Sequence, residues 1–142
     1  MRHSRTAGVC TAALALATTA SLSLPSVANA GTKVCITRSG VGKTCIRSYK
    51  SGGTWVFNMT YTNESNAPQN VTIYLYRDGQ PDALKAQSQP DYDQPGQTTS
   101  WGYPVTPNGL ACGKPFYALG ESYTAGATSY QDVFSPDTIS CQ

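Results

Sequence analysis

Histidine is almost missing from this 142-residue chain, since His3 is the only one. Histidine is the commonest general base in enzymes, a frequent metal ligand, and the base in Ser-His-Asp and Cys-His nucleophile systems. If the N-terminal residues are removed, no histidine remains to serve as a general base, as a metal ligand or in a nucleophile system. We therefore expect no catalytic residue, no metal site and no cofactor, and we expect that the protein is not an enzyme.

A pair of carboxylates is the catalytic device that survives this exclusion. Glycoside cleavage needs two acids about 5 to 9.5 Å apart beside a sugar cleft. The candidates are Asp91, Asp93, Glu64 and Glu121. Asp91 and Asp93 stand among prolines, where acidic side chains are usually solvated, and they offer too few ligands to favour calcium. We expect binding rather than catalysis.

Long apolar runs are also lacking, because no stretch after Ala30 approaches the roughly 20 residues that a membrane-spanning helix needs. The chain begins with a basic segment, Met1–Arg5, continues through an Ala-rich apolar stretch to about Leu24, and reaches Ala28-Asn29-Ala30. These are the three parts of a secretory signal peptide. We expect residues 1–30 to be cleaved and residues 31–142 to be secreted as a single domain without a membrane anchor.

Cysteine is scarce, and the predicted mature chain contains an even number of cysteines. Cys10 leaves with the signal peptide, and an even number in an exported protein favours disulfides over metal binding. Cys35 and Cys45 flank a glycine-containing turn, and folding the chain about Gly40 places them on opposite strands of a hairpin, within disulfide distance. The sequence therefore predicts two bridges, Cys35 with Cys45 and, by remainder, Cys112 with Cys141.

The charge balance argues against nucleic acid as a partner. The chain has ten Lys/Arg, and removing Arg2 and Arg5 leaves eight against eight Asp/Glu, whereas nucleic-acid-binding proteins carry a basic patch. The bases are unevenly placed, because five fall within the first twenty mature residues and the acids begin at Glu64. They form either a solvated hairpin whose lysines discourage aggregation, or a cationic surface for an acidic partner.

Amphipathic helical periodicity is absent, whereas alternation with a period of two recurs. Residues 54–62 alternate with Trp55, Phe57, Met59 and Tyr61 on one face, which predicts a central, half-buried strand. We also expect strands at residues 71–77 (with Val71, Ile73 and Leu75 inward), 116–122, 129–134 and 138–141.

Five prolines fall within residues 81–109. Proline removes a backbone donor and is excluded from central strands, so we expect a long, mostly irregular loop there with one short strand near residues 101–105. The whole pattern predicts an all-β fold, a small immunoglobulin-like β-sandwich (or small barrel) of six to eight strands with two disulfides.

The segment 55–65 followed by 70–79 resembles the paired strands of bacterial immunoglobulin-like modules, in which an Asn such as Asn63 turns the chain and the second strand ends in Asp-Gly. The resemblance implies a sandwich and leaves function open. The cysteine layout is similar to that of small secreted actinomycete proteins such as the tendamistat-type amylase inhibitors, but their Trp-Arg-Tyr triplet is absent, so amylase inhibition is not implied. Adaptor subunits of secreted actinomycete toxin particles are similar in size and export signal.

Aromatic residues are plentiful, since fourteen follow Ala30, nine of them tyrosine. Such side chains dominate interface hot spots and sugar-stacking surfaces. We expect a protein-binding module, either an adaptor or structural subunit of an extracellular assembly or a protein inhibitor, whose partner is another secreted or cell-surface protein. The alternative is a carbohydrate or cell-wall binding module that uses exposed Trp and Tyr. The candidate binding residues are Tyr92, Trp101, Tyr103, Arg38, Lys43 and Arg47.

Overall fold

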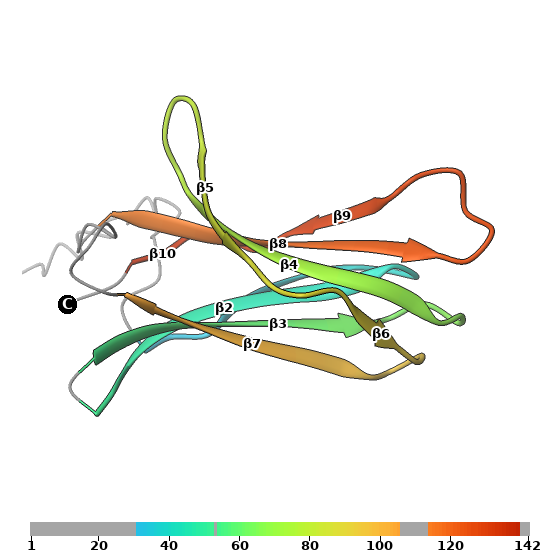
Figure 1. Ribbon diagram of the computed structural model, residues 1–142, viewed down its shortest axis with the longest axis horizontal. Coiled ribbons are helices and arrows are strands. Elements are labelled where there is room, and N and C mark those ends of the chain that lie inside the picture. Colours follow the sequence, from blue (N-terminus) through green and yellow to red (C-terminus); the bar gives the residue numbers. More distant parts are fainter. Residues whose placement is uncertain (1–30, 53, 106–113, 140–142) are drawn as a thin grey trace, which may run out of the picture.

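Two antiparallel sheets make up the described part of the chain, which comprises residues 31–52, 54–105 and 114–139 of a computed structural model (Figure 1). One sheet has the order β1-β2-β3-β7, and the other has the order β10-β8-β4-β5, with β6 also paired to β4 and β9 to β8. The strands are β1 (Val34–Arg38), β2 (Gly42–Ser51), β3 (Thr54–Asn63), β4 (Gln69–Arg77), β5 (Ala83–Gln87), β6 (Asp91–Asp93), β7 (Thr98–Val105), β8 (Pro115–Thr124), β9 (Gln131–Phe134) and β10 (Thr138–Ile139).

The all-β class is confirmed, because none of the described residues is helical. It follows that no helix within the described ranges has the length and apolar character to cross a membrane.

The N-terminal hairpin forms as predicted. β1 pairs with β2 through five residue pairs with Cys35 opposite Cys45, and a disulfide joins the two. Gly40 supplies the left-handed backbone of the turn with φ at 72°, a conformation that glycine adopts without steric cost. The second predicted bridge, between Cys112 and Cys141, lies outside the described residues, as does the predicted signal peptide.

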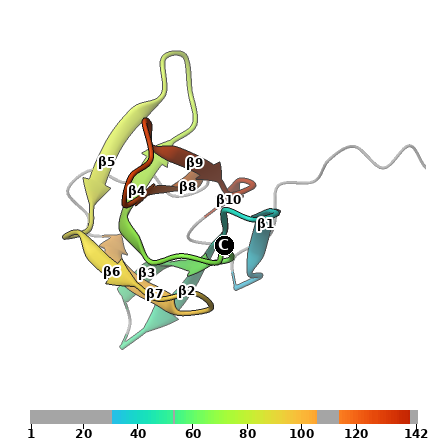
Figure 2. The ribbon, with the colours of Figure 1, turned by 90° about the vertical axis from the view of Figure 1, so that its right-hand side faces the viewer.

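The two sheets face each other, as the end-on view shows (Figure 2), and the buried core residues come from strands of both. On β3, which is an interior strand as predicted, Phe57 and Met59 are fully buried. On β4, the predicted inward residues Val71, Ile73 and Leu75 are buried too and belong to the same core. Fully burying one such side chain contributes roughly 1.5 to 3 kcal/mol, so this alternation is the main source of stability.

Buried polar groups join the sheets at the end where β3 turns into β4. The hydroxyl of Tyr61 lies 3.1 Å from the carbonyl oxygen of Val41 and 3.0 Å from Oε1 of Gln69. Asn63, fully buried, donates from Nδ2 to the carbonyl oxygens of Ala67 and of Asp93. These bonds stabilise the turn that follows β3. They also give the buried amide of Asn63 the hydrogen-bond partners that buried polar groups need.

The proline-rich segment differs from the prediction. Instead of a mostly irregular loop with one short strand, residues 83–105 form β5, β6 and β7. The prolines stand at permissive places: Pro90 and Pro95 flank β6, and Pro104 lies near the end of β7, which pairs on one side with β3. Edge strands and strand ends tolerate proline because no ladder donor is lost there. The described residues consequently hold ten strands rather than six to eight.

Gly120, in the middle of β8, offers a test of this packing. An added Cβ would overlap the ring of Tyr61 and the hydroxyl of Thr44, both fully buried. Gly120→Ala should lower the free energy of unfolding by about 1 to 3 kcal/mol through overpacking, measured by urea denaturation. At Gly102 the nearest atom to an added Cβ is 3.6 Å away, so Gly102→Ala should change stability by less than about 0.5 kcal/mol. Equal losses in the two variants would contradict this packing.

Candidate functional site

The outer face of the six-stranded sheet carries most of the tyrosines. Successive side chains of a strand point to opposite faces, so the inward residues of β4 leave Tyr74 and Tyr76 pointing away from the core. The β4–β8 register places Tyr117 opposite Tyr76 and Leu119 opposite Tyr74. The tyrosine face, as we name it, comprises Tyr74, Tyr76, Tyr117, Tyr123, Tyr130 and Phe134.

The rings of the tyrosine face touch one another in two groups. Tyr76 stacks on Tyr117 with centroids 5.3 Å apart, and Phe134 continues this group 6.0 Å from Tyr117. Tyr123 and Tyr130 form the second group with centroids 5.2 Å apart. These are the offset and tilted arrangements that aromatic pairs prefer, so the rings are held in place before any partner arrives.

Exposure and charge both set this face apart. Five large hydrophobic side chains are exposed in the part of the chain that the structure describes, and of these Tyr130 (64%) and Phe134 (51%) belong to the tyrosine face, while Leu84 lies beside it opposite Tyr76. Its charged members in β8 and β9 are Glu121 and Asp132. None of the residues that the register places on this face in β4, β8 and β9 is Lys or Arg. The face is therefore both aromatic and acidic.

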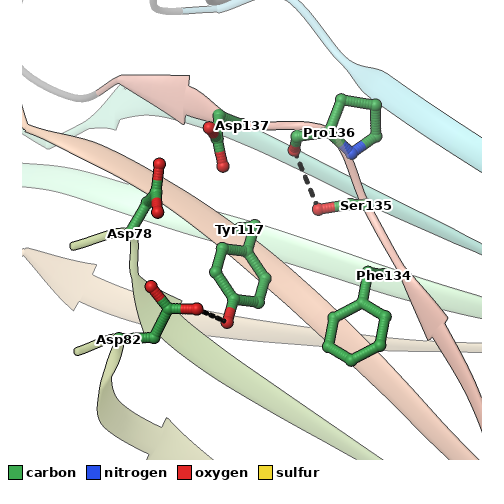
Figure 3. A pocket seen from close by; sticks show the side chains of 7 residues that line it. All are labelled: Asp78, Asp82, Tyr117, Phe134, Ser135, Pro136 and Asp137. Carbon is green, nitrogen blue, oxygen red and sulfur yellow. Dashed lines mark hydrogen bonds between the residues drawn. The ribbon is translucent and has the colours of Figure 1, made fainter. Parts of the chain in front are cut away.

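A pocket of about 380 Å³ lies at the end of this face, and we call it the acidic pocket. Its carboxylates are Asp78, Asp82 and Asp137, while the rings of Tyr117 and Phe134 form the aromatic part of its lining (Figure 3). The Tyr117 hydroxyl donates to Asp82 at 2.7 Å. Ser135 and Pro136 also line the pocket, and none of its lining residues within the described ranges is Lys or Arg.

The pocket shifts the pKa values of its groups in opposite directions. The hydrogen bond from Tyr117, followed by one from the backbone amide of Gly79, lowers the pKa of Asp82. Burial, followed by the charge of Asp78, raises the pKa of Asp137. Burial and the bond to Asp82 also raise the pKa of Tyr117. The pocket thus crowds negative charge that no cation in its lining offsets.

A second hollow of about 360 Å³, which we call the tyrosine hollow, lies on the same face. Its most exposed aromatic wall is Tyr130, and Glu121 within it accepts a hydrogen bond of 3.2 Å from the Tyr74 hydroxyl. Its lining is mainly hydroxyl, amide and ring groups, and comprises Asn70, Thr72, Tyr74, Gln87, Pro90, Glu121, Tyr123 and Tyr130.

The structure separates the three aromatic residues that the sequence singled out. Tyr92 is 54% exposed and lies opposite Asn70, so it extends the tyrosine face onto β6. Trp101 and Tyr103 belong to β7, where they lie opposite Met59 and Phe57 and pack partly buried against the core. The short strand expected near residues 101–105 is confirmed as part of the longer β7, whereas the role of these two residues in binding stays a prediction.

The basic candidates are likewise divided. Lys43 and Arg47 lie on the outer face of the four-stranded sheet, with the Arg47 guanidinium 4.9 Å from the centroid of the Tyr49 ring. Arg38, at the end of β1, instead donates to the carbonyl oxygen of Asp132 at 3.3 Å. The structure therefore does not gather the three into one cluster, and their part in binding also stays a prediction.

Of the carboxylates considered for catalysis, Glu121 lines the tyrosine hollow, whereas Asp91 and Asp93 line neither of the two hollows described above. The hydroxyl of Thr99 in β7 lies 3.0 Å from Oδ2 of Asp91 and 2.7 Å from Oδ1 of Asp93, so its single proton can be donated to either carboxylate, which fastens β6 to β7. Asp93 is inaccessible to solvent, and its Oδ2 has no hydrogen-bond partner. Its pKa is raised by burial and, to a smaller extent, by the charge of Asp91, whereas the Thr99 bond lowers it. Within the described ranges, no three His, Cys, Asp or Glu side chains are arranged to hold a metal ion.

Sequence reasoning missed most of the tyrosine face. The signal was present in the outward positions of residues 71–77, where Tyr74 and Tyr76 occupy places that a solvated strand usually fills with small polar residues. The acidic pocket had no such signal, because Asp78, Tyr117 and Asp137 meet only through the pairing of β4, β8 and β10.

Thr99→Val tests the fastening of β6 to β7. The variant loses the hydroxyl that donates its proton to these carboxylates, and a hydrogen bond to a charged group contributes about 1.5 to 3 kcal/mol, so the free energy of unfolding should fall by about that amount. The raised pKa of Asp93 means that the folded state holds this proton more tightly than the unfolded chain. Its contribution to stability is therefore fullest at acidic pH and declines as the pH rises from about 3.9 through the raised value. Because the Thr99 hydrogen bond lowers the pKa of Asp93, its loss should extend the decline in stability to higher pH. Denaturation across a pH series measures this decline.

Thr98→Val is the matched control, because Thr98 is exposed and shares its hydroxyl hydrogen bond with Thr62. It should change stability little and leave the pH dependence as in the unmodified protein. Identical pH profiles for the two variants would refute the role given to Thr99.

The chain matches no protein family model, no curated protein and no solved structure.

Proposed function

We propose that the protein is a secreted, non-enzymatic protein-binding module, an adaptor or structural subunit of an extracellular assembly or a protein inhibitor, and that its tyrosine face holds a partner with a basic surface. The observation that carries the proposal is the two groups of aromatic rings, with carboxylates and without Lys or Arg, on the outer face of β4, β8 and β9. Exposed aromatic patches of this kind mark interaction sites, and Tyr is among the commonest hot-spot residues.

The acidic pocket supports a basic partner in particular. A Lys or Arg side chain entering it would lie near Asp78, Asp82 and Asp137 and beside the ring of Phe134. The carboxylates attract the cation, and an aromatic ring contributes a further cation–π attraction of about 0.5 to 2 kcal/mol. The cation would also relieve the like-charge repulsion from Asp78 that, after burial, raises the pKa of Asp137.

Secretion is supported by the predicted signal peptide and by the Cys35–Cys45 disulfide, because disulfides persist in oxidising compartments. The two packed antiparallel sheets also support the proposal of an immunoglobulin-like sandwich. The absence of histidine after residue 30 and the burial of Asp93 support a function in binding rather than catalysis.

Affinity capture with variants tests this proposal. The immobilised protein should retain a stoichiometric basic protein from the culture supernatant of the producing organism, and Phe134→Ala should weaken retention about tenfold or more by removing a central ring. Raising the salt from about 0.15 to about 1 M should weaken it too, because the Debye length falls from about 8 to about 3 Å. The matched control is Ile36→Ala, an exposed apolar residue (46%) on β1 of the other sheet. Equal retention by both variants would rule out the tyrosine face.

The acidic pocket predicts how partner binding depends on pH. A carboxylate attracts a cation only when ionised, and the raised pKa of Asp137 means that it loses its charge at a higher pH than an ordinary aspartate. The affinity should therefore begin to fall, as the pH is lowered, while exposed aspartates are still ionised. Asp137→Asn should weaken binding at neutral pH and remove the first part of this decline, as measured by titration calorimetry. Glu64→Gln, an exposed carboxylate on the turn after β3, should leave the profile unchanged.

A further inference from the structure

The tyrosine hollow has a composition unlike that of the acidic pocket. Three of its eight lining residues are tyrosines, two carry side-chain amides, and a single one, Glu121, is charged. From this composition we propose a second binding activity, in which the tyrosine hollow holds a neutral oligosaccharide. This activity goes beyond the proposed protein binding and does not depend on it.

The walls of the hollow suit the faces of sugar rings. Tyr123 and Tyr130 are tilted by 48° with centroids 5.2 Å apart, and Tyr130 is the most exposed of the large hydrophobic side chains. A pyranose ring presents a flat face of C–H groups, which packs on such a ring plane, while the tyrosine hydroxyl keeps a polar tip for the sugar's hydroxyl groups.

The polar lining suits sugar hydroxyls. Among the described residues, the side-chain amides of Asn70 and Gln87 have no hydrogen-bond partner. Each offers both donors and an acceptor, and the carboxylate of Glu121 offers acceptors. Hydroxyl groups both donate and accept, so they can pair with all of these. No Lys or Arg of the described segments lines the hollow, which disfavours an anionic ligand, and a cation finds more carboxylates in the acidic pocket.

The register gives the site its length. Tyr92 lies opposite Asn70, and Asn70 lies opposite Tyr123, so a row of side chains runs from β6 across β4 to β8 and on to Tyr130. Neighbouring strands are about 4.8 Å apart, so three spacings span about 14 Å. This row is longer than one sugar ring, which favours a chain of sugars over a monosaccharide. The volume of about 360 Å³ lies within the usual range for small-ligand sites, about 300 to 1,000 Å³.

Titration calorimetry with soluble neutral hexasaccharides of β-1,4-linked glucose, xylose and N-acetylglucosamine tests the proposal, and sedimentation with insoluble cellulose, chitin and peptidoglycan shows which polymer is the source. At least one hexasaccharide should bind, and the affinity should not change with salt because the ligand is uncharged. Tyr130→Ala should weaken binding about tenfold or more through loss of a ring contact. Gln87→Ala should also weaken it.

The matched control is Tyr49→Ala, a tyrosine on the outer face of the opposite sheet, which should bind as the unmodified protein does. Failure of all three hexasaccharides to bind at about 5 mM, a concentration that reveals even millimolar affinity, would overturn the proposal. Equal weakening by Tyr130→Ala and Tyr49→Ala would overturn it as well. Asp137→Asn should reduce capture of a basic protein while leaving oligosaccharide binding intact, so failure of one site is distinguishable from failure of the other.

Discussion

Nine residue pairs join β4 to β8, from Gln69 opposite Thr124 to Arg77 opposite Phe116. This pairing determines which side chains enter the core and which form the tyrosine face. A slip of one residue would turn every side chain of a strand to the other face. It would expose Ile73 and Leu75 and bury the outward tyrosines without partners for their hydroxyl groups. Both faces of β4 carry aromatic or aliphatic side chains, so burial alone does not select the register. The packing of side-chain shapes and the hydrogen bonds of the tyrosine hydroxyl groups select it as well.

The same pairing separates charge across the molecule. The outward positions of β8 and β9 include Glu121 and Asp132, whereas the other sheet presents Lys43 and Arg47 on its outer face. A near-neutral domain therefore has two outer faces of opposite character, a property that net charge alone conceals. Charges on a surface steer association and select partners more than they add affinity, so the two faces should attract different partners.

The sequence predicted those parts of the fold that depend on local pattern. Alternation identified β3 and the inward residues of β4, and the glycine-centred turn identified the Cys35–Cys45 pair, because each depends on residues close in the chain. Proline misled the prediction for residues 83–105, since its effect depends on whether a strand lies at an edge, which is a property of the assembled sheet. The acidic pocket was not predictable for a related reason: Asp78 and Asp82 share the turn between β4 and β5, but Asp137 reaches them only through strand pairing, which no spacing in the sequence records.

A binding site on paired strands has an energetic advantage over a site on an irregular loop, such as the one that the sequence predicted for residues 81–109. Binding orders side chains at a cost of about 0.5 to 1.5 kcal/mol for each one that is immobilised. Tyr76 and Tyr117 are already stacked, and the Tyr117 hydroxyl is already bonded to Asp82, so much of this cost is met on folding. The bonds from Thr99 to Asp91 and Asp93 fix β6, and with it Tyr92, against the other sheet. The tyrosine face is therefore preorganised by the same contacts that join β6 to β7. Variants that weaken these contacts should weaken ligand binding even where the substituted residue does not touch the ligand.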